Sequence, residues 1–593
     1  MNTKQAMESM LEDLRSELEA ASGKRICDII LYNVKIVDVY SERITDGSVA
    51  IYNGRIVAIN PSEHIKARNM LDGHGQYAVP GFIDSHVHVE TTLLTPEALG
   101  NLLAPWGTTS MFVDAMEIAN VAGLEGLKSL VNSSSHLPFR MYLEIPSRVP
   151  TMPGFETTGG TLEVSEVEQL FEDDAAISLG ELDPSKVLDI KDNYLRKILC
   201  TLLNRRICNG HAIGLSPQDL NVYAAGHLAD DHECVSGDDL INRLRVGIGV
   251  MLREGSSERN TVELIKCVLA NGLPTDSLMF CTDDKHANDI AREGHISYNI
   301  QLAIDLGMPA ITAIKMASLN AARHFHMEHE LGSIAPGRFA DIVLLPSLDK
   351  IVPAMVIKGG KVVFDGEKKY SRINAHYPEK LMNTVKLPLN LCANSFRIPA
   401  EGSRALCRVI GMIPNQIINE EHQIWMDITD GEVKPDLRRD ILKLAVVERY
   451  GKTSNVMSAF VQGFGLKNGA LASSVSHDHH NIVVVGCNDN DMLLAVRELE
   501  KTQGGFAAVA GGKIAGTMPL PLAGLMSTEP ADIVMGRMDE LNGIVAKLGC
   551  CMKAPFMSLS FISLPTVPQL GLTDMGLVDV LEHRFIDSII ETK

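Results

Sequence analysis

Residues 80–90 read PGFIDSHVHVE, an apolar run that ends in histidine and carboxylate side chains. In a β-strand, side chains two residues apart project from the same face, so His86 and His88 share one face. Two neutral imidazoles on one face form half of a metal site. Each ring must also be held in one tautomer by an acceptor such as Asp84. The alternative is a pair of buried, hydrogen-bonded core histidines.

Short apolar segments alternate with helix-like segments around this stretch, from Tyr77 to His329. The apolar segments are YAVPGFIDSHVH (77–88), TTSMFVDA (108–115), FRMYLEI (139–145), AAISLGEL (175–182), AIGL (212–215) and SLMFCTDD (277–284). Most of them end in, or lie beside, residue types that bind metals or catalyse reactions. Alternating βα units of this length favour a parallel barrel, whose chemistry lies at the C-terminal ends of its strands.

Two β-rich pieces flank the barrel region of residues 77–329. They cover residues 25–76 and 330–378, and we expect them to form one small sheet domain together. Turns are predicted at Tyr32-Asn33, Asn53-Gly54 and Gly359-Gly360.

The two ends of the chain have different patterns. Residues 1–24 are charged and amphipathic, which predicts an N-terminal helix. Residues 379–593 combine several strand-like runs with NDMLLAVRELEKTQ (490–503), whose apolar residues recur with helical periodicity. We therefore expect a third, α+β domain.

Length, charge and cysteine usage limit the class of protein. A chain of 593 residues is too long for one core, and its formal net charge of −20 disfavours nucleic acid and anionic membranes as partners. The 11 cysteines include no CxxC pair, and no apolar segment is typical of a signal peptide or a membrane span. We expect a cytoplasmic protein with reduced thiols.

The PGFIDSHVH run resembles the first-strand signature of the amidohydrolase superfamily. Longer stretches are similar to the adenine deaminase family within it: FVDAMEIANV (112–121), EIPSRVPTMPGFETTGG (144–160), SVSHDHHNIVVVGCNDNDM (474–492) and GGFAAVAGGKIAGTMPLPLAGLMS (504–527). The resemblance covers nearly the whole chain. It implies a distorted (β/α)8 barrel, a small β-sandwich formed from both flanks, and an additional C-terminal α+β domain. The implied reaction is hydrolytic deamination of adenine to hypoxanthine and ammonia in purine salvage.

The resemblance also implies two divalent metal ions, manganese or iron(II), with zinc as an alternative. Its ligand pattern matches His86 and His88 for one ion, His211 and His232 for the other, Glu181 as a bridge, and Asp283, which is also the implied general base. Taken alone, Glu181 could be a solvated acidic residue and His211 a turn or core histidine. We expect His227, outside the matching stretch, on the surface.

Other residues have roles that the pattern leaves open. Glu117 and Glu233 are both candidates for the acid that protonates ring N1 of adenine. Either Asp283 or its neighbour Asp284 could instead cap the following helix. The residues expected to contact substrate or support the ligands are Asp84, Asp114, Asp284, His477 and His479.

The run His477-Asp478-His479-His480 has two interpretations. It is either a solvated turn, or a C-terminal loop that closes the barrel mouth or gathers a further metal ion. The resemblance places it near the site without giving it a role.

Two departures from the family pattern concern the substrate. Met116 stands where the family usually has histidine, and LDPSKVL (182–188) replaces a Met-Asn-rich segment. These changes favour, as an alternative, another two-metal amidohydrolase acting on a modified purine or a cyclic amide. A non-catalytic scaffold is the remaining alternative, although every expected ligand is present. A homodimer is expected by family analogy only.

Overall fold

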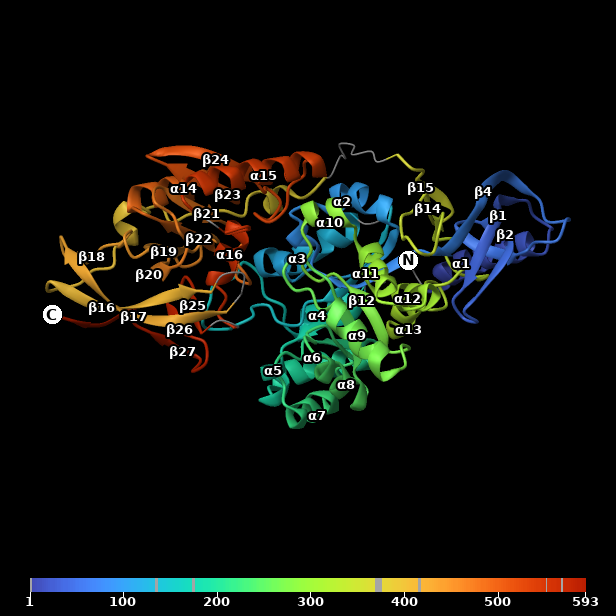
Figure 1. Cartoon of the computed structure of the whole chain (residues 1–593), viewed down its shortest axis with the longest axis horizontal. Helices are drawn as coiled ribbons and strands as arrows, with labels where there is room; N and C mark the ends of the chain where they lie inside the picture. The colour runs from blue at the N-terminus through green and yellow to red at the C-terminus, as the bar shows by residue number, and fades with distance from the viewer. Residues whose placement is uncertain are drawn as a thin grey trace.

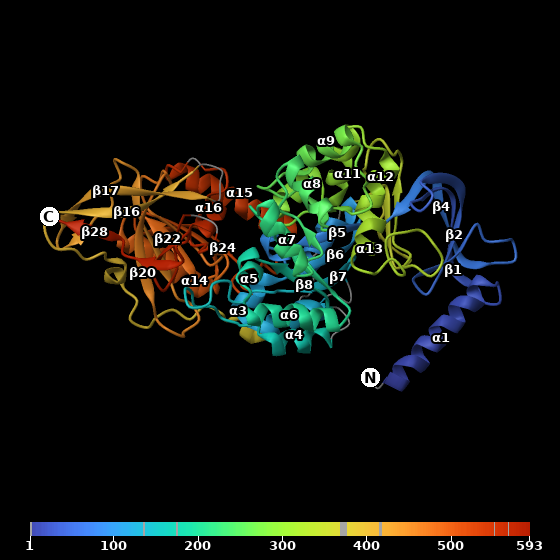
Figure 2. The ribbon, with the colours of Figure 1, turned by 90° about the horizontal axis from the view of Figure 1, so that it is seen from below.

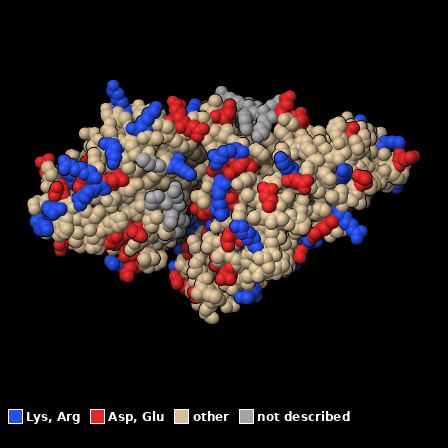
Figure 3. Space-filling view, in the orientation of Figure 1, with Lys and Arg blue, Asp and Glu red and all other residues tan. Residues whose placement is uncertain are grey.

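The computed structural model describes residues 3–133, 137–172, 176–367, 376–413, 418–550, 552–566 and 569–593. The barrel lies in the middle of an elongated molecule, with the C-terminal sheets at one end (Figure 1). The sheet that contains the first strands lies at the other end. Lys, Arg, Asp and Glu side chains are mixed over the face seen in Figure 3, without a large area of one sign.

Eight parallel strands form the barrel, in two sheets of five and three strands. They are β5 (Phe82–Val87), β6 (Thr108–Asp114), β7 (Arg140–Ile145), β8 (Ala176–Leu182), β9 (Ile207–Gly210), β10 (Asp230–Asp231), β11 (Gly249–Arg253) and β12 (Leu278–Cys281). Parallel bridges Cys208–Leu228 and Val87–Asp283 join the two sheets into a ring. The irregular (β/α)8 barrel expected from the sequence is therefore confirmed.

One predicted barrel strand is wrong. Residues 212–215, AIGL, form a turn in which Gly214 has φ +65°. The fifth strand, β9, lies before His211 instead of after it. Only glycine enters this left-handed region without steric cost. Because Gly214 adopts it, the chain turns here, and the apolar residues on either side of Gly214 do not form a strand.

The two flanks form one seven-stranded sheet, in the order β15-β14-β13-β4-β1-β2-β3. The connection between the flanks is the antiparallel pair of β4 (Ala67–Pro80) and β13 (Ile342–Leu345). Its other strands are β1 (Cys27–Asp38), β2 (Arg43–Tyr52), β3 (Arg55–Ile59), β14 (Met355–Lys358) and β15 (Lys361–Phe364).

Two of the three predicted turns in this sheet are confirmed. Asn53 and Gly54 have φ of +50° and +77° between β2 and β3, and Gly359-Gly360 joins β14 to β15. Consecutive positive φ values are what a two-residue hairpin turn requires. The turn predicted at Asn33 is wrong, because β1 runs through it and only shifts register there.

The predicted N-terminal helix is α1 (Thr3–Ala21), which extends away from the sheet, as Figure 2 shows.

The C-terminal part contains a ten-stranded sheet and a three-stranded sheet. The helix predicted over 490–503 is α14 (Asp489–Thr502), capped by the side chain of Asn488. The main strands are β16 (Arg404–Met412), β17 (Asn419–Thr429), β19 (Ile441–Val447), β20 (Val456–Gln462), β21 (Ala470–Ser473), β22 (Ile482–Gly486), β23 (Gly505–Ala510) and β24 (Lys513–Pro519).

A continuous apolar core connects the barrel to the C-terminal part. Leu99 and Leu102 of α2 (Pro96–Leu103) belong to the same buried cluster as Val534 and Leu541 of α15 (Ala531–Lys547). Burial of apolar area is the main stabilising contribution to such contacts. The C-terminal part is therefore packed against the barrel. Among the helices that the structure describes, none combines the length and apolar character needed to cross a membrane.

Candidate metal centre

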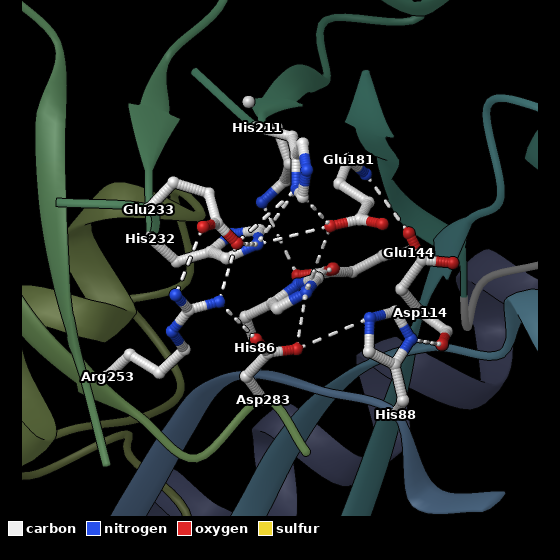
Figure 4. A network of polar contacts seen from close by, with 12 residues as sticks. His86, His88, Asp114, Glu144, Glu181, His211, His232, Glu233, Arg253 and Asp283 are labelled. Atoms are coloured by element: carbon white, nitrogen blue, oxygen red, sulfur yellow. Dashed lines mark hydrogen bonds and ion pairs between the residues drawn. The ribbon is translucent and has the colours of Figure 1, made fainter. Parts of the chain in front are cut away.

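Six side chains converge at the C-terminal ends of the barrel strands (Figure 4). β5 carries His86, and His88 lies directly after it; Glu181 is the last residue but one of β8. Directly after β9 comes His211, and directly after β10 comes His232. One residue separates Asp283 from the end of β12. The structure thus brings together all six residues that the sequence pattern predicts as ligands: His86, His88, Glu181, His211, His232 and Asp283.

Glu181 lies between the two pairs of histidines. Its Oε2 is 3.0 Å from Nδ1 of His211 and 3.1 Å from Nε2 of His232. The same oxygen is 3.9 Å from Nε2 of His86. Two groups that could each hold a metal ion, His86-His88-Glu181 and Glu181-His211-His232, therefore share this carboxylate.

The protein fixes the tautomers of the first two histidines. Nδ1 of His86 donates to Glu144 at 2.7 Å, and Nδ1 of His88 donates to the backbone carbonyl of Asp114 at 2.8 Å. A neutral imidazole that donates from Nδ1 has a lone pair on Nε2, which is the state that binds a metal. Within the described residues, Nε2 of His86 is buried without a hydrogen-bond partner. These residues fit a divalent ion.

Asp84 is not the acceptor for the ring of His86; its Oδ1 accepts from the backbone N–H of His86 at 3.3 Å. Its carboxylate accepts from Thr282 Oγ1 at 2.5 Å and lies 3.2 Å from Nε2 of His295. Burial raises the pKa of Asp84 to about 7. The acceptor is instead Glu144 at the end of β7, which reaches His86 across the barrel interior.

Arg253 links two acidic residues of the site. Its Nη1 lies 2.5 Å from Oε1 of Glu233 and 2.8 Å from Oδ2 of Asp283. Burial favours a raised pKa for Asp283, but Arg253 and the neighbouring histidines outweigh it and hold that pKa below its usual value. Glu233 is at the metal centre, with Oε1 3.6 Å from Nδ1 of His211 and 3.5 Å from Nε2 of His232.

Sequence reasoning missed Arg148, which forms a buried ion pair with Oε1 of Glu181. Arg148 belongs to the quoted stretch after β7, but nothing in that stretch indicated its partner. Asp114 was one of the residues expected to contact substrate or support the ligands; its side chain accepts from the backbone N–H of Glu181 at 3.0 Å.

The second candidate acid, Glu117, lies in a different group. Its Oε1 is 3.2 Å from Nδ1 of His477 and its Oε2 is 2.8 Å from Nε2 of His480. All four residues of 477–480 are buried, so the interpretation as a solvated turn is wrong. Within the described residues, His479 forms no hydrogen bond with Glu117 or with a predicted ligand; its Nδ1 accepts from the N–H of Asn481.

The remaining predicted residues lie beside the centre or outside it. The Oδ1 atom of Asp284 is buried and unpaired in the described part of the chain. Burial and the adjacent Asp283 raise the pKa of Asp284 to about 8. Met116 is buried at the first position of α3 (Met116–Ser133), and residues 184–188 of LDPSKVL form α5 (Pro184–Leu188). His227 is exposed, as expected.

Comparison with known proteins places the chain in a family. The amidohydrolase family matches residues 77–363, and the adenine deaminase C-terminal domain matches residues 416–584. Adenine deaminase of Desulforamulus reducens is 55% identical over 588 residues, covering 98% of this chain and 100% of that protein. This chain belongs to the adenine deaminase family.

Other members of the adenine deaminase family align over similar lengths. Adenine deaminase of Methanothrix thermoacetophila is 39% identical, covering 98% of this chain and 100% of that protein. Adenine deaminase 2 of Carboxydothermus hydrogenoformans is 37% identical, covering 96% of this chain and 98% of that protein. The family expected from the sequence is confirmed, and membership of the amidohydrolase family implies that divalent metal ions bind here.

Proposed function

We propose that the protein hydrolyses adenine to hypoxanthine and ammonia in purine salvage. The observation that carries this proposal is the pair of ligand groups that share Glu181, with Asp283 beside them at the barrel mouth. A full-length relative at 55% identity that is named adenine deaminase supports the choice of substrate.

We assign His86 and His88 to one divalent ion, His211 and His232 to a second, and Glu181 to both. When bound, such ions lower the pKa of water and so supply a nucleophile near neutral pH. A mixed set of imidazole and carboxylate ligands accepts manganese, iron(II) or zinc. The family resemblance favours manganese or iron(II).

Asp283 is the proposed general base. Its Oδ1 faces Nε2 of His86 and His88 at 3.9 and 3.4 Å, while Arg253 holds its other oxygen. A carboxylate fixed in this way accepts a proton from the attacking water and returns it to the departing amino group at C6. Arg253 favours the ionised form that this role requires.

Glu233 and Glu117 remain the two candidate acids for ring N1. Glu233 lies within 3.6 Å of the side chains of His211 and His232, but Arg253 donates to both of its oxygens. Both oxygens of Glu117 are likewise engaged, by His477 and His480. Whichever residue carries the proton, its transfer to N1 keeps negative charge from accumulating on the ring.

A second candidate function is deamination or hydrolysis of a modified purine or a cyclic amide by the same residues. It is favoured by Met116 and by residues 182–188, where this chain departs from the family pattern close to Glu117 and Glu181. The expectations of a homodimer and of a cytoplasmic location stay predictions.

The test is ammonia release from adenine by the purified protein loaded with manganese or iron(II). Asp283→Asn should abolish turnover, and Asp284→Asn, which changes the neighbouring carboxylate, should retain measurable turnover. Bound metal is measured in both variants. A metal-loaded wild-type protein that leaves adenine unchanged but releases ammonia from another purine would establish the second candidate function instead.

A further inference from the structure

The loop of residues 476–481 from the C-terminal part contacts the barrel beside the metal centre. Its His477 and His480 both reach Glu117 of α3, and the side chain of Asn481 donates to the backbone carbonyl of Thr157 at 2.8 Å. We refer to residues 476–481 as the roof loop. The proposed chemistry gives this loop no part, although it holds three buried histidines.

The roof loop and Glu117 have the residue types of a third metal site, but the hydrogen bonds of His480 argue against one. Nδ1 of His480 accepts from the backbone N–H of Ser476 at 3.2 Å. The proton of a neutral ring must then be on Nε2, which donates to Glu117 at 2.8 Å. Because Nε2 has no free lone pair in this state, His480 fastens the loop to the barrel and does not ligate an ion.

His477 differs from His480 because only one of its nitrogens is used. Nδ1 lies 3.2 Å from Glu117, and the ring stacks on Phe561 with 4.9 Å between centroids. Among the described residues, Nε2 of His477 is buried and has no hydrogen-bond partner. A buried polar atom without a partner is costly, and a ligand atom that accepts from Nε2 would remove this cost.

His477 borders a cavity of about 550 Å³. This volume lies in the range of roughly 300–1,000 Å³ that small-molecule sites occupy. The side chains of the C-terminal part that line it include the apolar Val534, Phe556 and Met557. Such a wall suits one face of a planar aromatic base.

The barrel side of this cavity is formed by residues that follow His88 and Asp283 in sequence and by the segment after β11. Thr91, on the wall, donates through N–H and Oγ1 to the backbone carbonyl of His88, at 3.2 and 2.8 Å. Ser256, also on the wall, donates its N–H to the carbonyl of Asp284 at 2.8 Å. The cavity therefore adjoins the segments after β5 and β12 at the barrel mouth.

We infer that Nε2 of His477 donates a hydrogen bond to ring nitrogen N3 or N7 of the purine, and that Glu117 acts through His477 as a positioning residue. The C-terminal part thus supplies a substrate contact to a site whose metal ligands all come from the barrel. This inference rests on the proposed function, whose substrate it requires.

The charge around His477 supports a donor at Nε2. Burial alone would lower the pKa of His477, but Glu117, with smaller contributions from Asp284 and Asp478, outweighs burial and raises it to about 9. Both ring nitrogens then carry protons near neutral pH, one donating to Glu117 and the other available to the base. Purine N3 and N7 are acceptors, so the chemistry is complementary.

The experiment compares wild-type protein, His477→Asn and His480→Asn with adenine, 3-deazaadenine and 7-deazaadenine. Values of kcat/KM are measured where a compound is turned over, and inhibition constants against adenine otherwise. His480→Asn is the matched control, because it removes a histidine from the same carboxylate but from a position that contacts only protein. Metal content is measured in every variant.

With adenine, His477→Asn should lower kcat/KM by about 10- to 100-fold, as expected for a hydrogen bond to a charged donor. With one of the two analogues this loss should disappear, because the acceptor nitrogen is absent. His480→Asn should affect all three compounds by the same factor. A purely structural role for His477 would give such a uniform loss in His477→Asn too, and that result would overturn the inference.

Measurements on the wild-type protein distinguish a failure of this inference from a failure of the proposed function. If wild-type protein deaminates adenine and His477→Asn does so equally well, the inference fails and the proposed function stands. If metal-loaded wild-type protein neither turns over nor binds adenine, the proposed function fails and the inference fails with it.

Discussion

Glu144 accepts a hydrogen bond of 2.7 Å from Nδ1 of His86, and both side chains are buried. The carboxylate holds the ring in the tautomer whose Nε2 faces the metal centre. It also makes that nitrogen more basic, which strengthens binding to a cation.

Glu144→Gln should therefore weaken metal binding by about 10- to 100-fold, the usual effect of removing such a partner. Metal affinity can be measured by competition with a chromogenic chelator. Asp84→Asn is the comparison, since Asp84 contacts Thr282 and His295 instead of the ring of His86. Equal weakening in the two variants would contradict the role given to Glu144.

Arg253→Met should destabilise the metal-free protein by about 3–5 kcal/mol, because it leaves Glu233 and Asp283 as buried carboxylates without their partner. Bound divalent ions would neutralise part of this charge, so the loss should be smaller in metal-loaded protein. Urea denaturation of both forms measures the difference. Arg259→Met, which removes a partly exposed pair with Glu293, should cost about 1 kcal/mol or less.

Glu156→Gln should stabilise the protein at alkaline pH relative to wild type. Burial raises the pKa of Glu156 to about 8, well above its usual value, although its Oε1 accepts from the N–H of Met152. The folded state therefore keeps a proton that the unfolded state releases, and this contribution to stability is lost as pH rises from about 4.5 to about 8. Glutamine does not titrate and avoids that loss.

Melting temperatures at pH 5.5 and 8.5 test this prediction, with the advantage of Glu156→Gln expected mainly at pH 8.5. The exposed Glu172→Gln is the control and should give the same difference from wild type at both values. A pH-independent effect of Glu156→Gln would show that burial of the charge is not the cause.

Lys197→Met should lower the free energy of unfolding by about 1–3 kcal/mol, the cost of leaving buried polar groups unpaired. The Lys197 ammonium donates to the backbone carbonyls of Ser147 at 2.8 Å and Leu162 at 2.6 Å, on either side of the segment after β7. Urea denaturation measures the change. The exposed Lys191→Met should change stability by less than about 0.5 kcal/mol.

The strand pattern alone indicated His86 and His88, which lie in and directly after a short apolar strand. The family pattern supplied Glu181, His211, His232 and Asp283. Asp283 also follows an apolar strand, whereas the strand predicted beside His211 was placed after this residue instead of before it. β10 has only two residues, too few for any periodicity to indicate a strand. β11 was missed, and Arg253 at its end was missed with it.

The residues that hydrogen-bond to or form ion pairs with the predicted ligands could not be predicted from their spacing along the chain. Glu144 reaches His86 from β7, and Arg148 reaches Glu181 from the segment after β7, so each contact depends on how the barrel curves. The roof loop is the extreme case, because His480 and Glu117 are 363 residues apart in sequence. Only packing of the C-terminal part on the barrel brings them together.

The bridge between Val87 and Asp283 joins the first barrel strand to the segment after the last one. The N–H of Asp283 donates to the carbonyl of His86 at 3.0 Å, and the N–H of His88 donates to the carbonyl of Asp283 at 3.2 Å. The same two backbone hydrogen bonds therefore close the ring and place the proposed base between the first two histidines. During synthesis, a nascent chain that stops before residue 283 has neither a closed barrel nor a full set of ligands. Binding of both metal ions by the full ligand set therefore requires the last barrel strand, β12, to be docked beside β5.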